Sequence, residues 1–297
     1  MTSGVVGRFA PSPSGALHMG SLVAALGSFL QARAQGGAWL LRIDDLDTPR
    51  VQPWAITRII DALEFFGLRW DGPIVYQDER RTAYARAIDH LKHSGRAFDC
   101  GCTRREARSG TVGIEGPIYP GTCRNGLPAG RSPRSVRLRV DACPIEVCDA
   151  VQGVYTQQLD RDIGDFVIRR ADGIVAYQLA TVVDDAYQGV TEVVRGADLL
   201  SSTPRQIALQ QALGLDTPRY AHLPVITDAN GDKLGKSTGA IALQPTKPAA
   251  QLCACLQWLG QAPPNTLYDA DIARVLHWAC DNWALAQVPR VAEITRR

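Results

Sequence analysis

A strand–helix–strand pattern within residues 5–47 restricts the fold more than any other feature of this sequence. Residues 5–9 are typical of a short strand, residues 11–15 form a Pro- and Gly-rich loop, and residues 38–43 are typical of a second strand. Between them the apolar side chains fall on one helical stripe: Leu22, Val23, Leu26, Phe29 and Leu30. Gly36 and Gly37 predict the end of that helix. Two strands joined by a helix predict parallel neighbours in an α/β sheet.

Polar residues follow both predicted strands. The loop at residues 11–15 follows the first, and Asp44, Asp45 and Asp47 follow the second. Ligands of open parallel sheets bind beyond the carboxyl ends of the strands. We therefore expect both loops to face one crevice.

The amino-acid composition changes in the middle of the chain. Helical patterns cover residues 54–66 and 80–93, but from about Asp99 the sequence becomes rich in Gly, Pro, Arg and Cys, and residues 135–140 alternate in polarity. This predicts a β-rich insertion. The turn sequence Ala171-Asp172-Gly173 predicts a hairpin between residues 166–170 and 174–179.

The last third is predicted to be mainly helical. A helix is expected from Thr203 to Leu213, where Gly214 ends it. Pro245 and Pro248 mark a boundary, and the apolar pattern beyond them predicts a small helical subdomain.

Charge and hydropathy exclude some classes of protein. The 32 Lys and Arg residues nearly balance 30 Asp and Glu residues, so a nucleic-acid surface would have to be a local patch. No apolar run reaches the length of a membrane span, and the amino terminus lacks a signal-peptide pattern. We expect a cytoplasmic protein without a membrane partner.

Residues 8–21 place His18 and several small residues at the junction between the first strand and its helix. Unpaired backbone N–H groups and the positive end of the helix dipole favour a phosphate there. Gly15 and Gly20 allow close approach of a nucleotide. Taken alone, such a loop is more often a plain connector.

A second loop, residues 232–237, carries Lys233 and Lys236 three positions apart. Alone it is typical of a solvated turn. Lysines on such a loop can also stabilise charge that develops on a transferring phosphoryl or adenylyl group.

Together these segments resemble class I aminoacyl-tRNA synthetases. Leu17-His18-Met19-Gly20 corresponds to the HIGH signature and Lys233-Leu234-Gly235-Lys236-Ser237 to KMSKS. Residues 41–50, 177–185 and 189–200 resemble blocks of the glutamyl-specific enzymes, in the same order over residues 4–240. The resemblance implies a Rossmann-type parallel sheet interrupted by the β-rich insertion.

The resemblance also implies a two-step reaction. Glutamate would attack the α-phosphorus of ATP to give glutamyl adenylate, and a nucleic-acid hydroxyl would then accept the glutamyl group. His18 and Gly20 would bind ATP, which carries Mg²⁺, and Lys236 with Lys233 would stabilise the transition state. The glutamate site carried over from the family comprises Arg8, Phe9, Ala10, Pro11, Ser12, Asp44, Tyr177 and Arg195.

An arginine fork favours glutamate over glutamine, because an amide presents donors to a donor and leaves a buried cation unpaired. Three positions depart from the family pattern. Asp44 stands where most relatives have Glu, Gly235 replaces a serine, and Thr181 stands where full-length glutamyl enzymes often have Asn.

Three of the eight cysteines lie close together in the sequence: Cys100, Cys102 and Cys123. Three thiolates suit a structural Zn²⁺ that needs one further ligand, and three buried free thiols are the alternative. Short synthetase-like relatives have a tyrosine ahead of the last cysteine, and this resemblance implies Tyr119 as the fourth ligand. The other five cysteines are assigned to packing.

The short length after the lysine loop resembles the glutamyl-queuosine tRNA(Asp) synthetases, a family without an anticodon-binding domain. That resemblance implies tRNA-independent glutamate activation, transfer to queuosine in the anticodon loop of tRNA(Asp), and a monomer. Basic insertion residues are candidates for phosphate contacts, and a solvated basic face is the alternative: Arg104, Arg105, Arg108, Arg124, Arg131, Arg134 and Arg137.

Two other functions remain open at this point. One is a minimal glutamyl-tRNA synthetase that charges the 3′ end of tRNA(Glu), and the other is a catalytically silent paralogue that binds tRNA or an amino acid. The expected organisation is a catalytic core in two halves at 1–98 and 171–240, an inserted zinc-containing subdomain at 99–170, and a helical subdomain at 241–297.

Overall fold

The computed structural model describes residues 4–228, 243 and 246–295. Its strands are β1 Val6–Phe9, β2 Ala38–Ile43, β3 Val75–Tyr76, β4 Ala97–Cys100, β5 Val112–Gly113, β6 Gly116–Pro117, β7 Ser135–Leu138, β8 Ile145–Asp149, β9 Gly153–Gln157, β10 Val167–Arg169, β11 Glu192–Gly196, β12 Arg219–Leu223, β13 Val225–Thr227 and β14 Glu293–Thr295. The α-helices are α1 Met19–Arg33, α2 Pro53–Phe65, α3 Arg81–His93, α4 Arg104–Ala107, α5 Leu159–Asp162, α6 Tyr177–Tyr187, α7 Thr203–Leu213, α8 Pro248–Trp258 and α9 Ile272–Asn282. Short 3₁₀ helices are η1 Asp78–Arg80, η2 Ala197–Ser202, η3 Asn265–Leu267 and η4 Leu285–Gln287.

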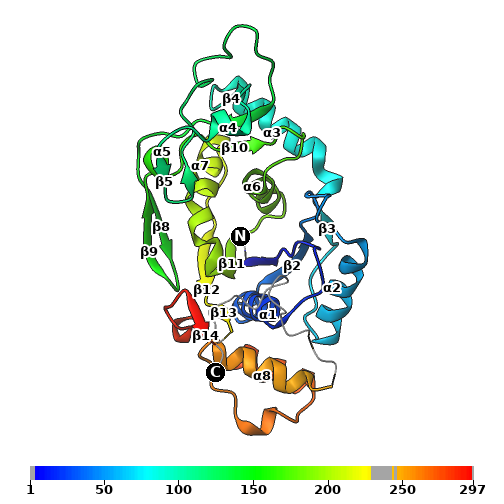
Figure 1. The fold of residues 1–297 in the computed structure, drawn as a ribbon. Helices are drawn as coiled ribbons and strands as arrows, with labels where there is room; N and C mark the ends of the chain where they lie inside the picture. Colours follow the sequence, from blue (N-terminus) through cyan, green and yellow to red (C-terminus); the bar gives the residue numbers. More distant parts are fainter. Residues whose placement is uncertain (1–3, 229–242, 244–245, 296–297) are drawn as a thin grey trace.

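The core of the fold is the predicted parallel sheet. Strand β2 pairs in parallel with both β1 and β3, and β12 pairs in parallel with β11. Strand β11 lies beside β1, where the Thr191 backbone N–H donates to the Val6 carbonyl at 3.0 Å. Helices α1 and α6 lie on opposite sides of β1 and β2 in Figure 1. This arrangement confirms the strand–helix–strand prediction.

The faces of β1 explain how this sheet orients the site. Neighbouring residues of a strand point to opposite faces. A Cβ on Gly7 would meet the Cβ of Ala32 in α1 at 3.2 Å, so Gly7 faces α1 at close range. Arg8 points the other way and pairs with Asp185 of α6. The strand thus presents an arginine on the α6 side of the sheet.

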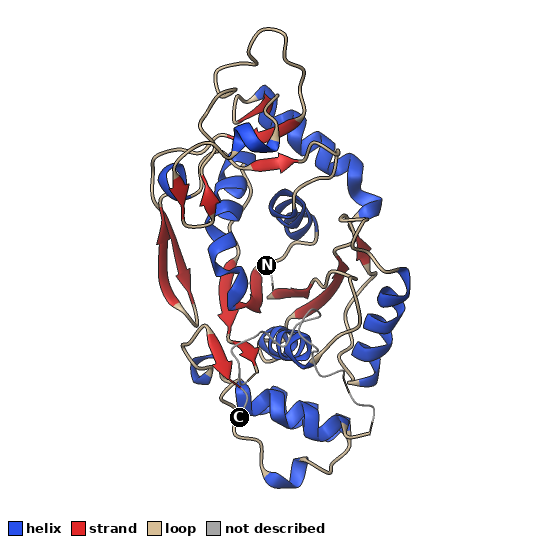
Figure 2. Ribbon diagram, in the orientation of Figure 1, coloured by secondary structure: helices blue, strands red, loops and turns tan. Residues whose placement is uncertain are grey.

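The predicted β-rich insertion contains short antiparallel strands. Strands β4, β7 and β10 form one sheet, with β7 in the middle, and β8 pairs with β9 in a hairpin at the edge of the parallel sheet. In Figure 2 these strands occupy the upper and left parts of the molecule, separate from the parallel core.

The hairpin predicted at residues 166–179 is only half right. The turn forms, with the Arg170 N–H donating to the Ile174 carbonyl at 2.8 Å, but the second arm is a single bridge between Arg169 and Val175. Tyr177 already begins helix α6, and burial from Leu179 onward is nearly continuous rather than alternating as in a half-buried strand.

The carboxyl-terminal region is helical, as predicted, with one addition. Helices α8 and α9 pack on each other and on α1, and the last described residues form β14, which pairs in parallel with β13. The helical pattern gave no indication of this strand. No helix among the described residues is long and apolar enough to cross a membrane.

A buried group of charges joins the sheet to α6. Arg42 of β2 donates from Nε to Asp44 at 2.8 Å and from Nη1 to Asp185 at 2.5 Å. Arg8 donates to the same Asp185 oxygen at 3.2 Å. The neighbouring Asp184 accepts from Arg80, Tyr84 and Gln77, which brings α3 and η1 into the same group. Charges buried to this extent are tolerated only when they are paired.

Replacing Arg42 by Met should lower the free energy of unfolding by about 3 kcal/mol or more, because buried carboxylates would lose their shared cation. Denaturant unfolding measures this. The control is Arg50→Ala, which removes an exposed pair with Asp47 and should leave stability nearly unchanged. Equal effects of the two substitutions would show that the buried charges do not hold α6 to the sheet.

Candidate active site

A cavity of about 430 Å³ opens where β1 and β11 end and α1 begins. This is the edge at which the sequence predicts a ligand site. The cavity wall contains these predicted site residues: Arg8, Phe9, Ala10, Pro11, Ser12, His18, Gly20, Tyr177 and Arg195. Residues far apart in the sequence therefore meet at one cavity.

His18 is the N-cap residue of α1. Its extended backbone ends the loop, and its Nδ1 accepts the Ser21 backbone N–H at 3.3 Å. Because the first turn of α1 faces the cavity together with His18 and Gly20, the positive end of the helix points into it. This geometry suits a phosphate group.

Arg8 and Arg195 are both buried in the cavity wall, but their partners differ. Arg8 pairs with the carboxylate of Asp185. Arg195 donates from Nε to Nε2 of His222 at 3.0 Å and from Nη2 to the Thr203 hydroxyl at 3.0 Å. Its Nη2 also donates to the Leu199 carbonyl at 3.4 Å. All three partners are neutral when His222 is unprotonated, so they leave the positive charge of Arg195 uncompensated.

The state of His222 depends on its surroundings. Burial lowers the pKa of His222, the hydrogen bond with Asp149 opposes that effect, and the positive charge of Arg195 lowers the pKa further. The net direction is downward. His222 is therefore neutral at neutral pH, as its contact with Arg195 requires.

Asp44 does not line the main cavity. It borders a neighbouring cavity of about 240 Å³, and Ser12 and Ser14 belong to the walls of both. Burial raises the pKa of the Asp44 carboxyl to about 6, although Arg42 beside it acts in the opposite direction. The carboxylate lies next to the main site rather than inside it.

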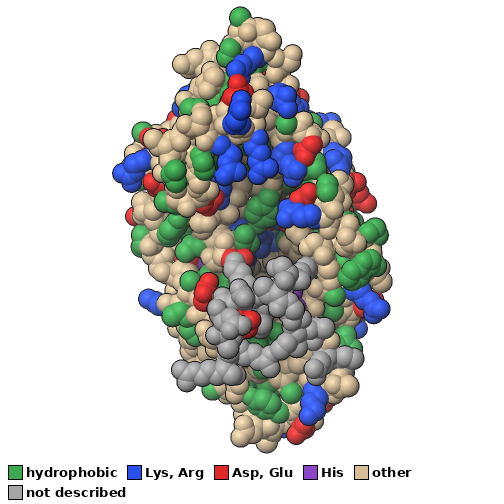
Figure 3. All heavy atoms as spheres, viewed as in Figure 1, with side chains coloured by type: hydrophobic (Ala, Val, Ile, Leu, Met, Phe, Trp, Pro, Cys, Tyr) green, Lys and Arg blue, Asp and Glu red, His purple; other side chains and the backbone are tan. Residues whose placement is uncertain are grey.

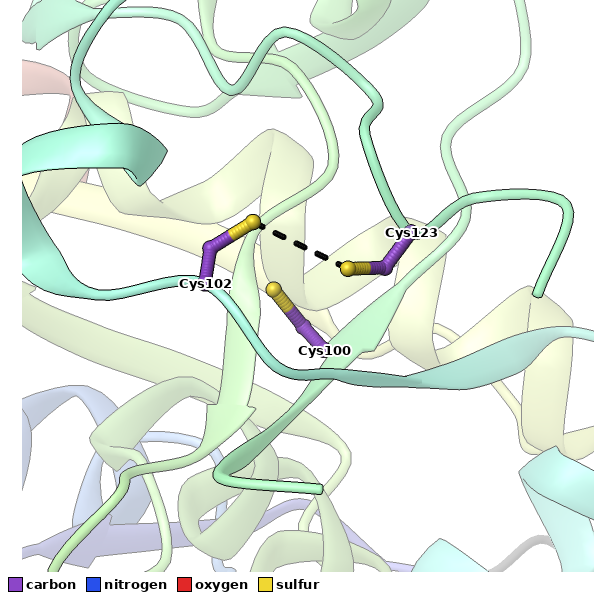
Figure 4. A group of neighbouring side chains, drawn as sticks. All are labelled: Cys100, Cys102 and Cys123. Carbon is purple, nitrogen blue, oxygen red and sulfur yellow. Dashed lines mark hydrogen bonds between the residues drawn. The ribbon is translucent and has the colours of Figure 1, made fainter. Parts of the chain in front are cut away.

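The three predicted cysteines come together. Their sulfur atoms lie within 4.8 Å of one another, and Cys102 and Cys123 are 3.7 Å apart (Figure 4). The Tyr119 hydroxyl lies 3.5 Å from Cys100 Sγ and 3.7 Å from Cys102 Sγ. Sulfur ligands about 2.3 Å from a tetrahedral Zn²⁺ would lie roughly 3.8 Å apart, so the donor set fits such an ion.

Within the cluster the electrostatics favour a thiolate at Cys100, whereas burial raises the pKa of Cys102. Burial opposes ionisation of Cys100, but hydrogen bonds from Tyr119, the Cys102 backbone and Arg137 outweigh it and lower the pKa of this thiol to about 7. Thiolates are the form of cysteine that binds metals.

The model of the class I tRNA synthetases (E and Q), catalytic domain, matches residues 4–247. A glutamyl-Q tRNA(Asp) synthetase of Dechloromonas aromatica is 54% identical over 98% of this chain and 97% of its own length. One of Chromobacterium violaceum is 54% identical over 95% of both chains. This chain belongs to the glutamyl-Q tRNA(Asp) synthetase family.

Solved structures agree with this assignment. A glutamate tRNA ligase of Elizabethkingia meningosepticum, solved in complex with its amino acid, superposes with a TM-score of 0.80 at 25% identity. The match covers 97% of this chain and 66% of that one. A glutamate-tRNA synthetase of Elizabethkingia anophelis gives 0.81, also at 25% identity, over 99% and 68%. The fold is therefore the α/β fold of class I synthetases, and the protein is a ligase of that class.

The structure does not describe every residue that the sequence predicts for the site. Lys233 and Lys236 lie outside the described residues. Thr181 and Asp44 are described, and Thr181 is buried on α6 with its hydroxyl unpaired within the described part of the chain.

The basic residues of the insertion divide into two groups. Arg104, Arg105, Arg108 and Arg134 are exposed. The prediction of phosphate contacts is wrong for Arg137, which is buried with its guanidinium 4.0 Å over the Tyr119 ring. Arg124 and Arg131 are part-buried and pair with Asp165 and Glu106. Figure 3 shows Lys and Arg side chains gathered above a central hollow.

Sequence reasoning missed the polar residues behind the cavity. Asp149 and His222 received no role, although both are buried and connect to Arg195. A signal existed: His222 interrupts an otherwise mostly apolar strand, β12, and a histidine buried in a strand needs hydrogen-bond partners.

Proposed function

We propose that the protein activates L-glutamate with ATP in the absence of RNA and transfers the glutamyl group to queuosine in the anticodon of tRNA(Asp). The observation that supports this most is one cavity with a helix amino terminus on one side and two buried arginines on the other. The helix end suits the ATP phosphates, and the arginines suit the carboxylates of glutamate.

Each residue then has a role in the first step. His18 and the Gly20 backbone bind the ATP phosphates, with Mg²⁺ carried on the nucleotide. Arg8 and Arg195 bind glutamate carboxylates, and Ser12 and Tyr177 add hydrogen bonds, with residues 9–11 completing the wall. Asp44 borders the neighbouring cavity that shares Ser12 and Ser14 with the main one, and from there it accepts from the substrate ammonium. Lys236, assisted by Lys233, stabilises the charge that develops on the α-phosphate.

The second step requires an RNA loop at the same cavity. The exposed arginines of the insertion, Arg104, Arg105, Arg108 and Arg134, offer cations to backbone phosphates. The names of the relatives, which are glutamyl-Q tRNA(Asp) synthetases, favour tRNA(Asp) as that RNA. We further propose that the protein acts as a cytoplasmic monomer.

Zinc is proposed as a structural ion at the cysteine cluster, bound by Cys100, Cys102 and Cys123 with the Tyr119 oxygen as fourth ligand. The cluster packs against Phe98 and two part-buried apolar residues, Ala107 and Leu127. So small a core supplies little hydrophobic stabilisation, and a metal would add what it lacks.

Glutamate should support ATP–pyrophosphate exchange without RNA, and Lys236→Ala should abolish it while circular dichroism shows an intact fold. Labelled glutamate should then attach to queuosine-containing tRNA(Asp) and not to the unmodified transcript. Exchange that requires tRNA(Glu) would instead indicate a minimal glutamyl-tRNA synthetase. No exchange, whether tRNA(Glu) is absent or present, would indicate a silent paralogue.

The affinity for glutamate should fall at low pH. Below about pH 6 the Asp44 carboxyl becomes protonated, and the substrate ammonium loses its negative partner. Between pH 7 and pH 5 the KM for glutamate should rise about tenfold in the wild type. Asp44→Asn serves as the control. Its KM for glutamate should already be raised at pH 7 and should not rise further between pH 7 and pH 5. Parallel pH profiles of the two enzymes would contradict the role of Asp44.

Cys100→Ser should reduce the zinc content, measured by elemental analysis of the purified protein, to well below half an equivalent, because a hydroxyl is a poor substitute for a thiolate ligand. Cys148→Ser is the matched control, since Cys148 is an exposed cysteine on β8. A full equivalent of zinc in the Cys100 variant would refute this set of ligands.

A further inference from the structure

Behind the cavity, three buried side chains form a hydrogen-bonded chain from Asp149 through His222 to Arg195. Asp149 ends β8, His222 lies in β12 and Arg195 lies in β11, so three neighbouring strands contribute one residue each. The Asp149 carboxylate lies 2.6 Å from Nδ1 of His222, and Arg195 Nε lies 3.0 Å from Nε2 of the same ring. His222 is completely buried.

Only one tautomer of His222 is compatible with these hydrogen bonds to Asp149 and Arg195. A guanidinium has N–H donors and no acceptor, so Nε2 must offer its lone pair to Arg195. A neutral imidazole then carries its proton on Nδ1, where it donates to Asp149. A protonated ring would present a second donor to Arg195 and place two positive charges in contact.

The groups packed around His222 are consistent with a neutral ring. Asp149 of β8 is the acid that faces it, while Arg195 of β11 and Arg8 of β1 supply positive charge, and α7 contributes only the Thr203 hydroxyl. Tyr220 stacks on it from the same strand. Burial and the two arginines lower the pKa of His222 against the effect of Asp149.

Asp149 is itself held in place. Its Oδ1 accepts the backbone N–H groups of Val151, Gln152 and His222 at 3.0, 2.8 and 3.1 Å. The other oxygen is left for the imidazole. A carboxylate fixed in this way holds the ring orientation without depending on solvent.

At the cavity end, Arg195 keeps one donor group unused. Its Nε is bound to His222 and its Nη2 to Thr203, whereas Nη1 is buried and has no partner within the described part of the chain. Arg195 also lines the main cavity. A buried guanidinium donor of this kind is expected to pair with an acidic ligand.

We propose that Asp149 and His222 are positioning residues for substrate recognition: by fixing one tautomer of the imidazole, they hold Arg195 with its Nη1 end toward a carboxylate of the amino acid substrate. This inference rests on the proposed binding of glutamate by Arg195. It adds a determinant of acidic-substrate recognition that lies outside the cavity wall.

The test begins with Asp149→Asn, which keeps the shape but places an amide N–H₂ opposite Nδ1. The imidazole proton then moves to Nε2, where it faces the Arg195 N–H group donor to donor. In glutamate-dependent ATP–pyrophosphate exchange, the KM for glutamate should rise about tenfold or more, while the KM for ATP changes less than about twofold. An unchanged KM for glutamate would overturn the inference.

A second substitution separates positioning from a merely structural effect. His222→Gln places an amide oxygen near the position of Nε2, where it accepts from Arg195 whatever residue 149 is. This variant should keep a KM for glutamate within about threefold of the wild-type value. His222→Leu has no acceptor at this position, so its KM for glutamate should rise about tenfold or more. In the His222→Gln background, Asp149→Asn should have little further effect. If Asp149→Asn raised the KM for glutamate equally in the wild type and in His222→Gln, the tautomer mechanism would be contradicted.

Controls distinguish this inference from the function on which it rests. Asp281→Asn alters the exposed His277–Asp281 pair and should leave all constants unchanged. If Arg195→Met leaves the KM for glutamate unchanged, or the wild type shows no exchange, the proposed function fails and the inference with it. If Arg195→Met raises the KM and Asp149→Asn does not, only the inference fails. Should Asp149→Asn prove unfolded, the comparison of Gln with Leu at position 222 decides the question.

Discussion

Buried arginine–aspartate pairing is the constraint on which the rest of the structure depends. Arg42 is completely buried between Asp44 and Asp185, and each charge would be prohibitively costly there without its partners. The pairs join β1 and β2 to α6 across the sheet face. Because Tyr177 is the first residue of α6 and Arg8 lies on β1, the same pairing sets the distance between two walls of the cavity.

The two arginines of the cavity are held by different chemistry, and this difference has a consequence for charge. Arg8 shares the Asp185 carboxylate with Arg42, so much of its charge is already matched inside the protein. Arg195 is held by an imidazole and a hydroxyl, which orient it without neutralising it. An anionic ligand in this cavity would therefore gain more from Arg195 than from Arg8, although both line the same wall.

The sequence predicted those parts of the fold and site whose signals are local. The strand at 38–43, the helix after His18 and the three cysteines each follow from neighbouring residues, and all were confirmed as elements or as a cluster. Contacts between residues far apart in the sequence gave no local signal of this kind. The link between Asp149 and His222 spans 73 positions, and the burial of Arg137 depends on Tyr119 and Asp165 from other segments. Sheet topology alone predicted that the loop at 11–15 and the aspartates at 44–47 meet, whereas only the resemblance to the synthetases predicted that Tyr177 and Arg195 share the main cavity.

The pairing of β8 with β12 shows why fold and site cannot be varied independently in this protein. The register of these strands rests on a single pair, Tyr220 with Asp149. The Asp149 carboxylate binds the backbone of its own turn and of His222, and so fixes that register as well as the imidazole. A shift of one residue would turn the side chains of β12 to the opposite face and remove His222 from Arg195. The contacts of Asp149 with His222 thus attach the β8–β9 hairpin to the parallel sheet, together with backbone bonds such as that from the Ala150 N–H to the Tyr220 carbonyl, and also hold the imidazole that contacts the arginine of the cavity.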